Sequence, residues 1–192
     1  MKVIGITGGI GSGKSTICSM LREAGYPVLD CDFYAKQLYI SDASVISDVK
    51  KQFGENVYKD SVLDRKALGE VVFNDKVSLD KLNSIIHPKV KEYMDFQIKV
   101  SKSDLFFVES AILFESGFNK YMEKILTVTA PKEIRIERAM KRDNTTREKI
   151  ETRMKFQICE ERRLYKSDFV ISTEQDLDKV KGFLFRLVEC MK

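Results

Sequence analysis

A glycine-rich segment near the start of the sequence carries the strongest chemical signal. Residues 8–15 read Gly-Gly-Ile-Gly-Ser-Gly-Lys-Ser, which matches the pattern G-x-x-x-x-G-K-[ST]. Glycines let successive backbone N–H groups face one anion, Lys14 adds a charge for the β- and γ-phosphates, and the Ser15 hydroxyl suits Mg²⁺. The helix expected to begin near Lys14 adds its N-terminal dipole. The pattern predicts a nucleoside triphosphate site formed by Gly8, Gly9, Gly11, Ser12, Gly13, Lys14, Ser15 and Thr16.

Carboxylates follow two of the expected strands. Asp30 ends the expected strand 27–30, Asp32 comes two residues later, and Glu109 ends the expected strand 105–109. The carboxyl ends of parallel strands line the ligand crevice of such a sheet. An Asp there can orient a substrate hydroxyl and accept its proton, which is the role expected for Asp32, with an N-cap as the alternative. If the segment stays extended, Asp30 lies on the same face as Asp32, and it is expected to contact substrate. Glu109 is expected to contact substrate as well and to bind Mg²⁺ through water. The alternative for Glu109 is an ordinary charge at the end of a strand.

His87 is the single histidine, and Pro88 follows it. The pair is typical of an N-cap with proline at the first helical position, so a helix is expected to end near residue 86 and another to start at Pro88. Histidine is an indifferent cap, which leaves contact with substrate as the second interpretation for His87.

Arginines recur at helical spacing in the stretch after Pro131. Arg135, Arg138 and Arg142 lie at i, i+3 and i+7, on one stripe of the expected helix. Arginines on a closing lid can neutralise the charge of a transferring phosphoryl group and exclude water. Arg138 and Arg142 are expected to contact phosphate or adenine, whereas most other charges here are expected to face solvent. Thr145 and Glu148 have the spacing of a capping box for a second helix.

The elements that would position these residues alternate between strand and helix. Short β-branched runs predict five buried strands, at 2–7, 27–30, 105–109, 125–129 and 168–172. Such alternation is typical of an α/β fold with a parallel sheet. Between the second and third strands the pattern is helical and contains no convincing strand. The helices expected there, broken at Gly54, Asn74–Asp75 and His87–Pro88, span residues 42–53, 64–73, 79–86 and 88–100.

Composition excludes several other classes. Of its 192 residues, 43% are hydrophobic and 32% are charged, which indicates a globular protein. The formal net charge of +4 is too small to indicate a nucleic-acid or membrane partner. The apolar runs are far shorter than the roughly 20 residues of a membrane span. The start lacks the apolar core of a signal peptide, and four widely spaced cysteines predict neither a metal site nor a disulfide framework, so a cytoplasmic location is expected.

The glycine-rich pattern alone does not distinguish between the classes of nucleoside triphosphate-binding protein. No N-K-x-D sequence for reading guanine is present, and the expected strand 105–109 ends in a lone Glu rather than in an acidic pair. The size favours a small-molecule kinase. A nucleotide-dependent switch that performs no catalysis is the alternative from a different class.

Six segments along the chain can be compared with known families: GITGGIGSGKST (Gly5–Thr16), VLDCD (Val28–Asp32), LDRKALGEVVF (Leu63–Phe73), LNSIIHPKV (Leu82–Val90), ILFESGF (Ile112–Phe118) and ERAMKRD (Glu137–Asp143). On these segments the chain resembles, along nearly its full length, the dephospho-coenzyme A kinase family of P-loop kinases. The aspartate pair, the HP segment and the ILFE segment distinguish this family from nucleoside monophosphate kinases. Three positions depart from the usual family pattern: Glu109 replaces Asp, Ser110-Ala111 replaces Val-Pro, and Arg135 stands where Gln is common.

The resemblance implies ATP- and Mg²⁺-dependent phosphorylation of the ribose 3′-hydroxyl of dephospho-coenzyme A, with Asp32, Lys14 and Arg138 as catalytic residues and His87 near the acceptor or the phosphates. A kinase of another nucleotide or nucleoside is the close alternative. Expected partners are the two substrates, without nucleic acid or membrane, in a monomer or weak homo-oligomer. One P-loop kinase domain over residues 1–192 is expected, divided into a nucleotide-binding core (1–32, 102–131 and 166–192), a helical acceptor lobe (33–101) and a lid (132–165).

Overall fold

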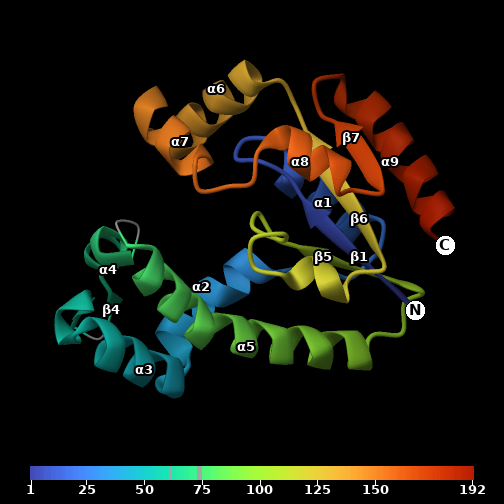
Figure 1. The fold of residues 1–192 in the computed structure, drawn as a ribbon. Coiled ribbons are helices and arrows are strands. Elements are labelled where there is room, and N and C mark those ends of the chain that lie inside the picture. The colour runs from blue at the N-terminus through green and yellow to red at the C-terminus, as the bar shows by residue number, and fades with distance from the viewer. Residues whose placement is uncertain (61, 73–74) are drawn as a thin grey trace. The chain divides into compact units, whose positions relative to one another are not determined.

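The computed structural model describes residues 1–60, 62–72 and 75–192, in two compact units. The first unit joins Met1–Asp30 to Val100–Lys192, and the second is the continuous segment Cys31–Lys99. The end of the expected helix 64–73 and the break at Asn74 lie outside the described residues. Figure 1 shows the elements of both units.

A five-stranded parallel sheet forms the centre of the first unit. Its strands lie in the order β2-β5-β1-β6-β7, and every neighbouring pair is parallel, which confirms the predicted α/β class. The central strands are buried along most of their length because helices cover the sheet, as their nearly continuous apolar sequences predict. The strands are β1 (Lys2–Thr7), β2 (Val28–Asp30), β5 (Leu105–Glu109), β6 (Lys124–Thr129) and β7 (Phe169–Ser172).

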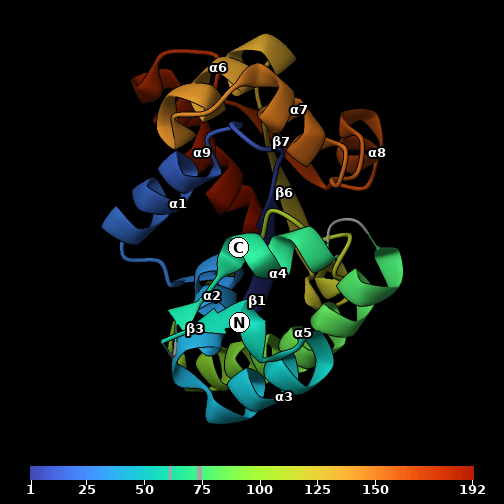
Figure 2. The ribbon, with the colours of Figure 1, turned by 90° about the vertical axis from the view of Figure 1, so that its left-hand side faces the viewer.

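Two helices, α1 (Lys14–Glu23) and α9 (Leu177–Met191), pack on one face of this sheet. Their buried side chains, among them Leu21 and Leu184, join those of the strands in one apolar cluster. Gly25 follows the end of α1: its φ is +86°, and the N–H of Tyr26 donates to the carbonyl of Leu21. Figures 1 and 2 show α8 (Glu160–Tyr165) on the opposite face.

Three short helices occupy the expected 132–165 segment, namely α6 (Lys132–Asp143), α7 (Arg147–Met154) and α8. The predicted capping box at Thr145 is wrong. The Thr145 N–H donates to the carbonyl of Met140 in the last turn of α6, so Thr146 becomes the N-cap of α7. A 3₁₀ turn, η2 (Phe118–Tyr121), lies between β5 and β6.

The second unit consists mainly of helices. Aspartates begin three of them: the side chains of Asp42, Asp64 and Asp75 each accept hydrogen bonds from backbone N–H groups of the first turn. Its elements are α2 (Cys31–Ser41), α3 (Ala43–Phe53), a 3₁₀ turn η1 (Glu55–Val57), α4 (Arg65–Val72) and α5 (Lys76–Val100), the last residue of which belongs to the first unit.

Two predictions for this unit are wrong. Pro88 does not divide the segment into two helices but lies inside α5, although an internal proline costs a hydrogen bond and about 3 kcal/mol. The helix continues because Leu82, Ile86, Val90 and Met94 form an uninterrupted buried stripe. A small antiparallel pair of strands, β3 (Tyr58–Lys59) and β4 (Val62–Leu63), occurs where no strand was expected.

Over the described residues, no helix combines the length and the apolar content needed to cross a membrane.

Candidate active site

The glycine-rich loop lies between β1 and α1, at the carboxyl end of the sheet. Gly11 and Gly13 have φ of +76° and +90°, which side chains other than glycine rarely adopt, and Gly13 is the N-cap of α1. The N–H of Ser12 donates to the carbonyl of Gly9 at 3.1 Å, which closes the turn. The loop is therefore a tight, glycine-dependent turn with the N-terminus of α1 at its end, where backbone N–H groups are able to bind an anion.

Lys14 is the first residue of α1, and its Nζ donates to the carbonyl oxygen of Gly8 at 2.9 Å. The ammonium group is thus held against the loop, and Lys14 is half-buried. Ser15 is in the first turn of the same helix and is exposed. The structure brings together the charge and the hydroxyl that the sequence assigns to phosphate and to Mg²⁺.

Asp30 and Glu109 end the neighbouring parallel strands β2 and β5 and are directly paired in register. Glu109 is buried, and Asp30 is half-buried. Burial, together with the negative charge of Glu109, raises the pKa of the Cys18 thiol on α1. The predicted placement of both carboxylates at one sheet edge is therefore found, and Cys18 is an uncharged member of the core.

Asp32 would lie on the same face as Asp30 only if the segment stayed extended, and it does not. It lies in the first turn of α2, because the helix begins at Cys31, one residue after β2 ends. Asp32 is helical, so it is not the N-cap of α2. It belongs to the second unit, but the chain connects it to Asp30 across a single residue.

His87 lies in the middle of α5, in the second unit, and is half-buried. The N-cap interpretation is therefore wrong. Burial lowers the pKa of the imidazole, which favours its neutral form near pH 7.

Arg138 and Arg142 lie on one side of α6 but have different surroundings. The guanidinium of Arg138 donates to the hydroxyl and carbonyl oxygens of Thr173, at 2.8 and 2.9 Å. The Thr173 hydroxyl in turn donates to the carbonyl of Ser12 in the glycine-rich loop, at 2.8 Å. Arg142 pairs with Asp143 at 2.7 Å, and this contact, with a second one from Arg153, holds the pKa of the Asp143 carboxyl well below its usual range.

Sequence reasoning missed Thr173, which connects Arg138 to the loop. Its position directly after the last strand, at the same sheet edge as Asp30 and Glu109, was the available signal. Gln157 was missed as well. Its Oε1 accepts from the N–H of Ile10 at 2.9 Å, and its Nε2 donates to the carbonyl of Ala111 at 3.0 Å. Nothing in the sequence around Gln157 marks this role.

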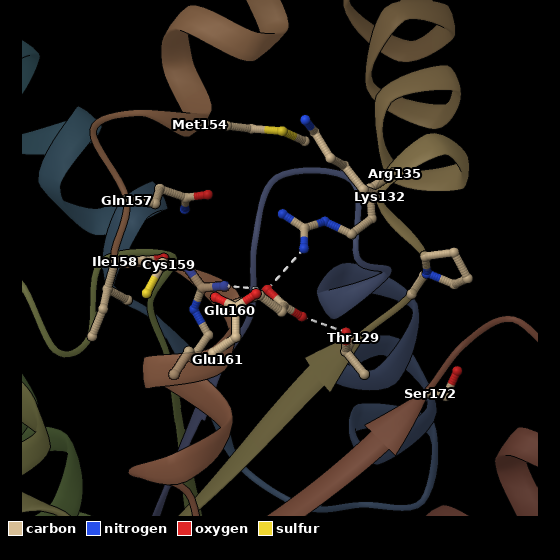
Figure 3. Close-up of a pocket in the computed structure, with 13 residues that line it drawn as sticks. Thr129, Lys132, Arg135, Met154, Gln157, Ile158, Cys159, Glu160, Glu161 and Ser172 are labelled. Atoms are coloured by element: carbon tan, nitrogen blue, oxygen red, sulfur yellow. Dashed lines mark hydrogen bonds and ion pairs between the residues drawn. The ribbon is translucent and has the colours of Figure 1, made fainter.

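A cavity of about 510 Å³ opens between the ends of β6 and β7 and the helices α6 to α8 (Figure 3). Gln157 and Arg135 line it, and the residues predicted from the sequence to form the site are not among its lining residues. Figure 3 shows Arg135 and Thr129 directed toward Glu160 at its wall, and both are hydrogen-bonded to that carboxylate. This cluster joins the start of α6 to the start of α8.

The sequence model of the dephospho-CoA kinase family matches residues 2–179. The chain belongs to the dephospho-CoA kinase family. A dephospho-CoA kinase of Fusobacterium nucleatum is 40% identical over 189 residues, which cover 97% of this chain and 95% of the relative. The recognition made from the sequence motifs is therefore confirmed.

Solved structures support the same assignment. A protein from Thermus thermophilus superposes with a TM-score of 0.88 at 34% identity, covering 100% of this chain and 98% of that one. A dephospho-CoA kinase from Campylobacter jejuni superposes with a TM-score of 0.70 at 29% identity, covering 97% and 95%. The predicted P-loop kinase fold is confirmed by these likenesses and by the parallel sheet.

Proposed function

We propose that this chain transfers the γ-phosphoryl group of ATP to the ribose 3′-hydroxyl of dephospho-CoA and releases CoA and ADP, the last step of CoA biosynthesis. The observation that carries the proposal is the folded P-loop inside a chain that belongs, over residues 2–179, to the dephospho-CoA kinase family. The two substrates are ATP and dephospho-CoA.

The triphosphate binds at the loop of residues 8–16. Backbone N–H groups of the loop and of the first turn of α1 donate to phosphate oxygens, and Lys14 balances charge on the β- and γ-phosphates. The contact of Lys14 with Gly8 supports this role, because it holds the side chain above the loop before nucleotide arrives. Preorganisation of this kind stabilises developing charge without reorganisation during the reaction.

The oxygen donors near the loop fit Mg²⁺. The Ser15 hydroxyl and the carboxylates of Asp30 and Glu109 are hard oxygen ligands. Within residues 1–60, 62–72 and 75–192, no group of three or more His, Cys, Asp or Glu side chains could by itself hold a metal ion. This suits an ion carried mainly by substrate phosphates and water, with Ser15 as direct ligand and Glu109 acting through water. When bound, Mg²⁺ neutralises charge between the β- and γ-phosphates.

Asp32 orients the acceptor hydroxyl and accepts its proton. Its place in the chain supports this, because it lies two residues after Asp30, in the first turn of α2. Residues 33–101 form the acceptor lobe in this proposal, where neutral His87 contacts the substrate. Asp30 and Glu109 contact substrate from the sheet edge.

Arg138 and Arg142 bind phosphate or adenine from the lid, residues 132–165. The connection from Arg138 through Thr173 to Ser12 supports a place beside the nucleotide. Guanidinium groups there offset charge on the transferring phosphoryl group. The enzyme acts in the cytoplasm as a monomer or weak homo-oligomer, without nucleic acid or membrane.

Asp32→Asn tests the proposal, with the exposed Asp48→Asn on α3 as matched control. Formation of CoA from dephospho-CoA and Mg-ATP should fall at least about 100-fold in kcat for Asp32→Asn and stay unchanged for the control. Full activity in Asp32→Asn would overturn the role of this residue. A wild-type protein that binds ATP but makes no CoA would overturn the substrate, and a panel of other nucleotides and nucleosides would then identify the acceptor.

A further inference from the structure

Arg135 is a buried arginine that lies against the P-loop. It is 7% exposed, and its Nε donates to the carbonyl oxygen of Ile10 at 3.2 Å. The contact extends to both neighbouring glycines. A Cβ added at Gly9 would lie 2.2 Å from Nη2 of Arg135, and one at Gly11 would lie 2.0 Å from its backbone oxygen. The loop at residues 9–11 therefore packs closely against this one residue of α6.

The orientation of one peptide group follows from that hydrogen bond. The peptide between Ile10 and Gly11 is trans, so its carbonyl and N–H point in opposite directions. Since the carbonyl faces the side chain of Arg135, the N–H of Gly11 faces away from that side chain. The preceding peptide is fixed in a similar way, because the Ile10 N–H donates to Gln157 and the Gly9 carbonyl accepts from Ser12.

Glu160 holds Arg135 in this position. Its Oε2 accepts from Nη1 of Arg135 at 2.8 Å, and its Oε1 accepts from the hydroxyl of Thr129 at the end of β6 (Figure 3). Arg163, which is 1% exposed, donates to the same Oε2 at 2.6 Å and to the carbonyl of Ile158 at 2.8 Å. The carboxylate thus fixes the guanidinium of Arg135 to the sheet on one side and to α8 on the other.

We propose that Arg135, held by Glu160, is a positioning residue for the triphosphate: it turns the Ile10–Gly11 peptide so that the Gly11 N–H faces the bound phosphates. Arg135 itself touches no substrate. It acts through the loop, and it couples the loop to the start of α6. The inference rests on the proposed function in one respect, that ATP binds at this loop.

The decisive experiment measures ATP binding and steady-state kinetics separately, for wild type and Arg135→Met. Methionine keeps an unbranched buried side chain but cannot donate to Ile10 or Glu160. The Kd for ATP should rise about 10-fold, the effect of losing one hydrogen bond from a charged donor, and KM for dephospho-CoA should change less than twofold. The matched control is Arg147→Met on α7, where 42% of the arginine side chain is exposed, and its ATP affinity should equal that of wild type.

Arg135→Lys covers the case in which Arg135→Met does not fold. Lysine keeps the charge but cannot make both contacts in the geometry of the guanidinium, so it should restore only part of the ATP affinity. Arg135→Met combined with Glu160→Gln should bind ATP no more weakly than Arg135→Met, because Glu160 acts through Arg135.

Unchanged ATP affinity in both Arg135 variants would overturn the proposal, and so would an equal loss for both substrates. Failure of the proposed function is distinguishable from this: wild-type protein would then make no CoA, while the comparison of ATP affinities between wild type and Arg135→Met would still be readable.

Discussion

Helices α6 to α8 carry two sets of arginines around carboxylates, and the two sets differ in burial rather than in distance. In the inner set, Arg135 and Arg163 lie 2.8 and 2.6 Å from Glu160, with 9% and 1% of their side chains exposed. In the outer set, Arg142 lies 2.7 Å from Asp143, with 58% exposed. Arg153 also contacts Asp143 and is 52% exposed.

Ion pairs of similar length in the two sets therefore contribute differently to stability. Exposed pairs contribute roughly 0 to 1 kcal/mol because water and salt screen them. Buried charges lose their hydration, so each depends on its partner, and removing one partner leaves the others uncompensated. Burial of this kind lowers the pKa of Arg163, and Glu160 opposes that shift. The inner set joins α6 and α8 to the end of β6, whereas the outer set joins α6 to α7 at the surface.

Glu160→Gln should show the largest effect. It leaves two buried guanidinium groups without a carboxylate between them, which should lower the free energy of unfolding by about 3 to 5 kcal/mol. Chemical denaturation measures this, with the exposed neighbour Glu161→Gln as the matched control, expected to change little. A loss below about 1 kcal/mol for Glu160→Gln would mean that the inner set contributes no more to stability than the outer set.

Arg138→Met should have an intermediate effect on stability. Arg138 is exposed overall but makes two good hydrogen bonds to Thr173, so about 1 kcal/mol of unfolding free energy should be lost. The same denaturation measurement on Arg147→Met, whose partners Glu133 and Glu151 have 64% and 37% of their side chains exposed, should give a smaller loss. The reverse order would mean that the link to Thr173 does not form in solution.

Asp143→Asn should have the smallest effect, about 0.5 kcal/mol at low salt and near zero in 1 M NaCl. The folded-state pKa of Asp143 is depressed, so its contribution is fully present above the ordinary carboxyl pKa, about 3.8, and is lost as pH falls through the folded value. The difference in Tm between wild type and variant should thus be constant from pH 5 to 8 and shrink below about pH 4. If the stability difference between wild type and Asp143→Asn persisted in 1 M NaCl, the Arg142–Asp143 pair would behave like the buried pairs of the inner set.

Local patterns predicted the parts of the site that local chemistry determines. The glycines and Lys14 adopt the expected loop because positive φ and a helix start are properties of neighbouring residues. The paired ends of β2 and β5 follow from parallel strands having a common edge. The family assignment, which needs only motifs in order along the chain, was correct.

The inner set could not be predicted, because its members are far apart in sequence. Arg135 and Glu160 are separated by 25 residues and meet only when α6 and α8 pack on the end of β6. Helical spacing put Arg135 on one stripe with Arg138 and Arg142, whereas tertiary packing buries the first and leaves the others exposed. Pro88 shows the same limit: a local break signal was overridden by the buried stripe of α5.

The order of strands in the sheet has a consequence for how the chain folds. β1 is made first, yet both its neighbours, β5 and β6, come about a hundred residues or more later, after the whole segment Cys31–Lys99. Closing so long a loop is entropically costly and slow, and early β1 has unpaired edges on both sides. Folding of the helical segment ahead of the sheet would shorten the effective loop, since its helices begin at their own aspartate caps. The inserted segment would then act during synthesis as a spacer that brings β1 and β5 within reach of each other.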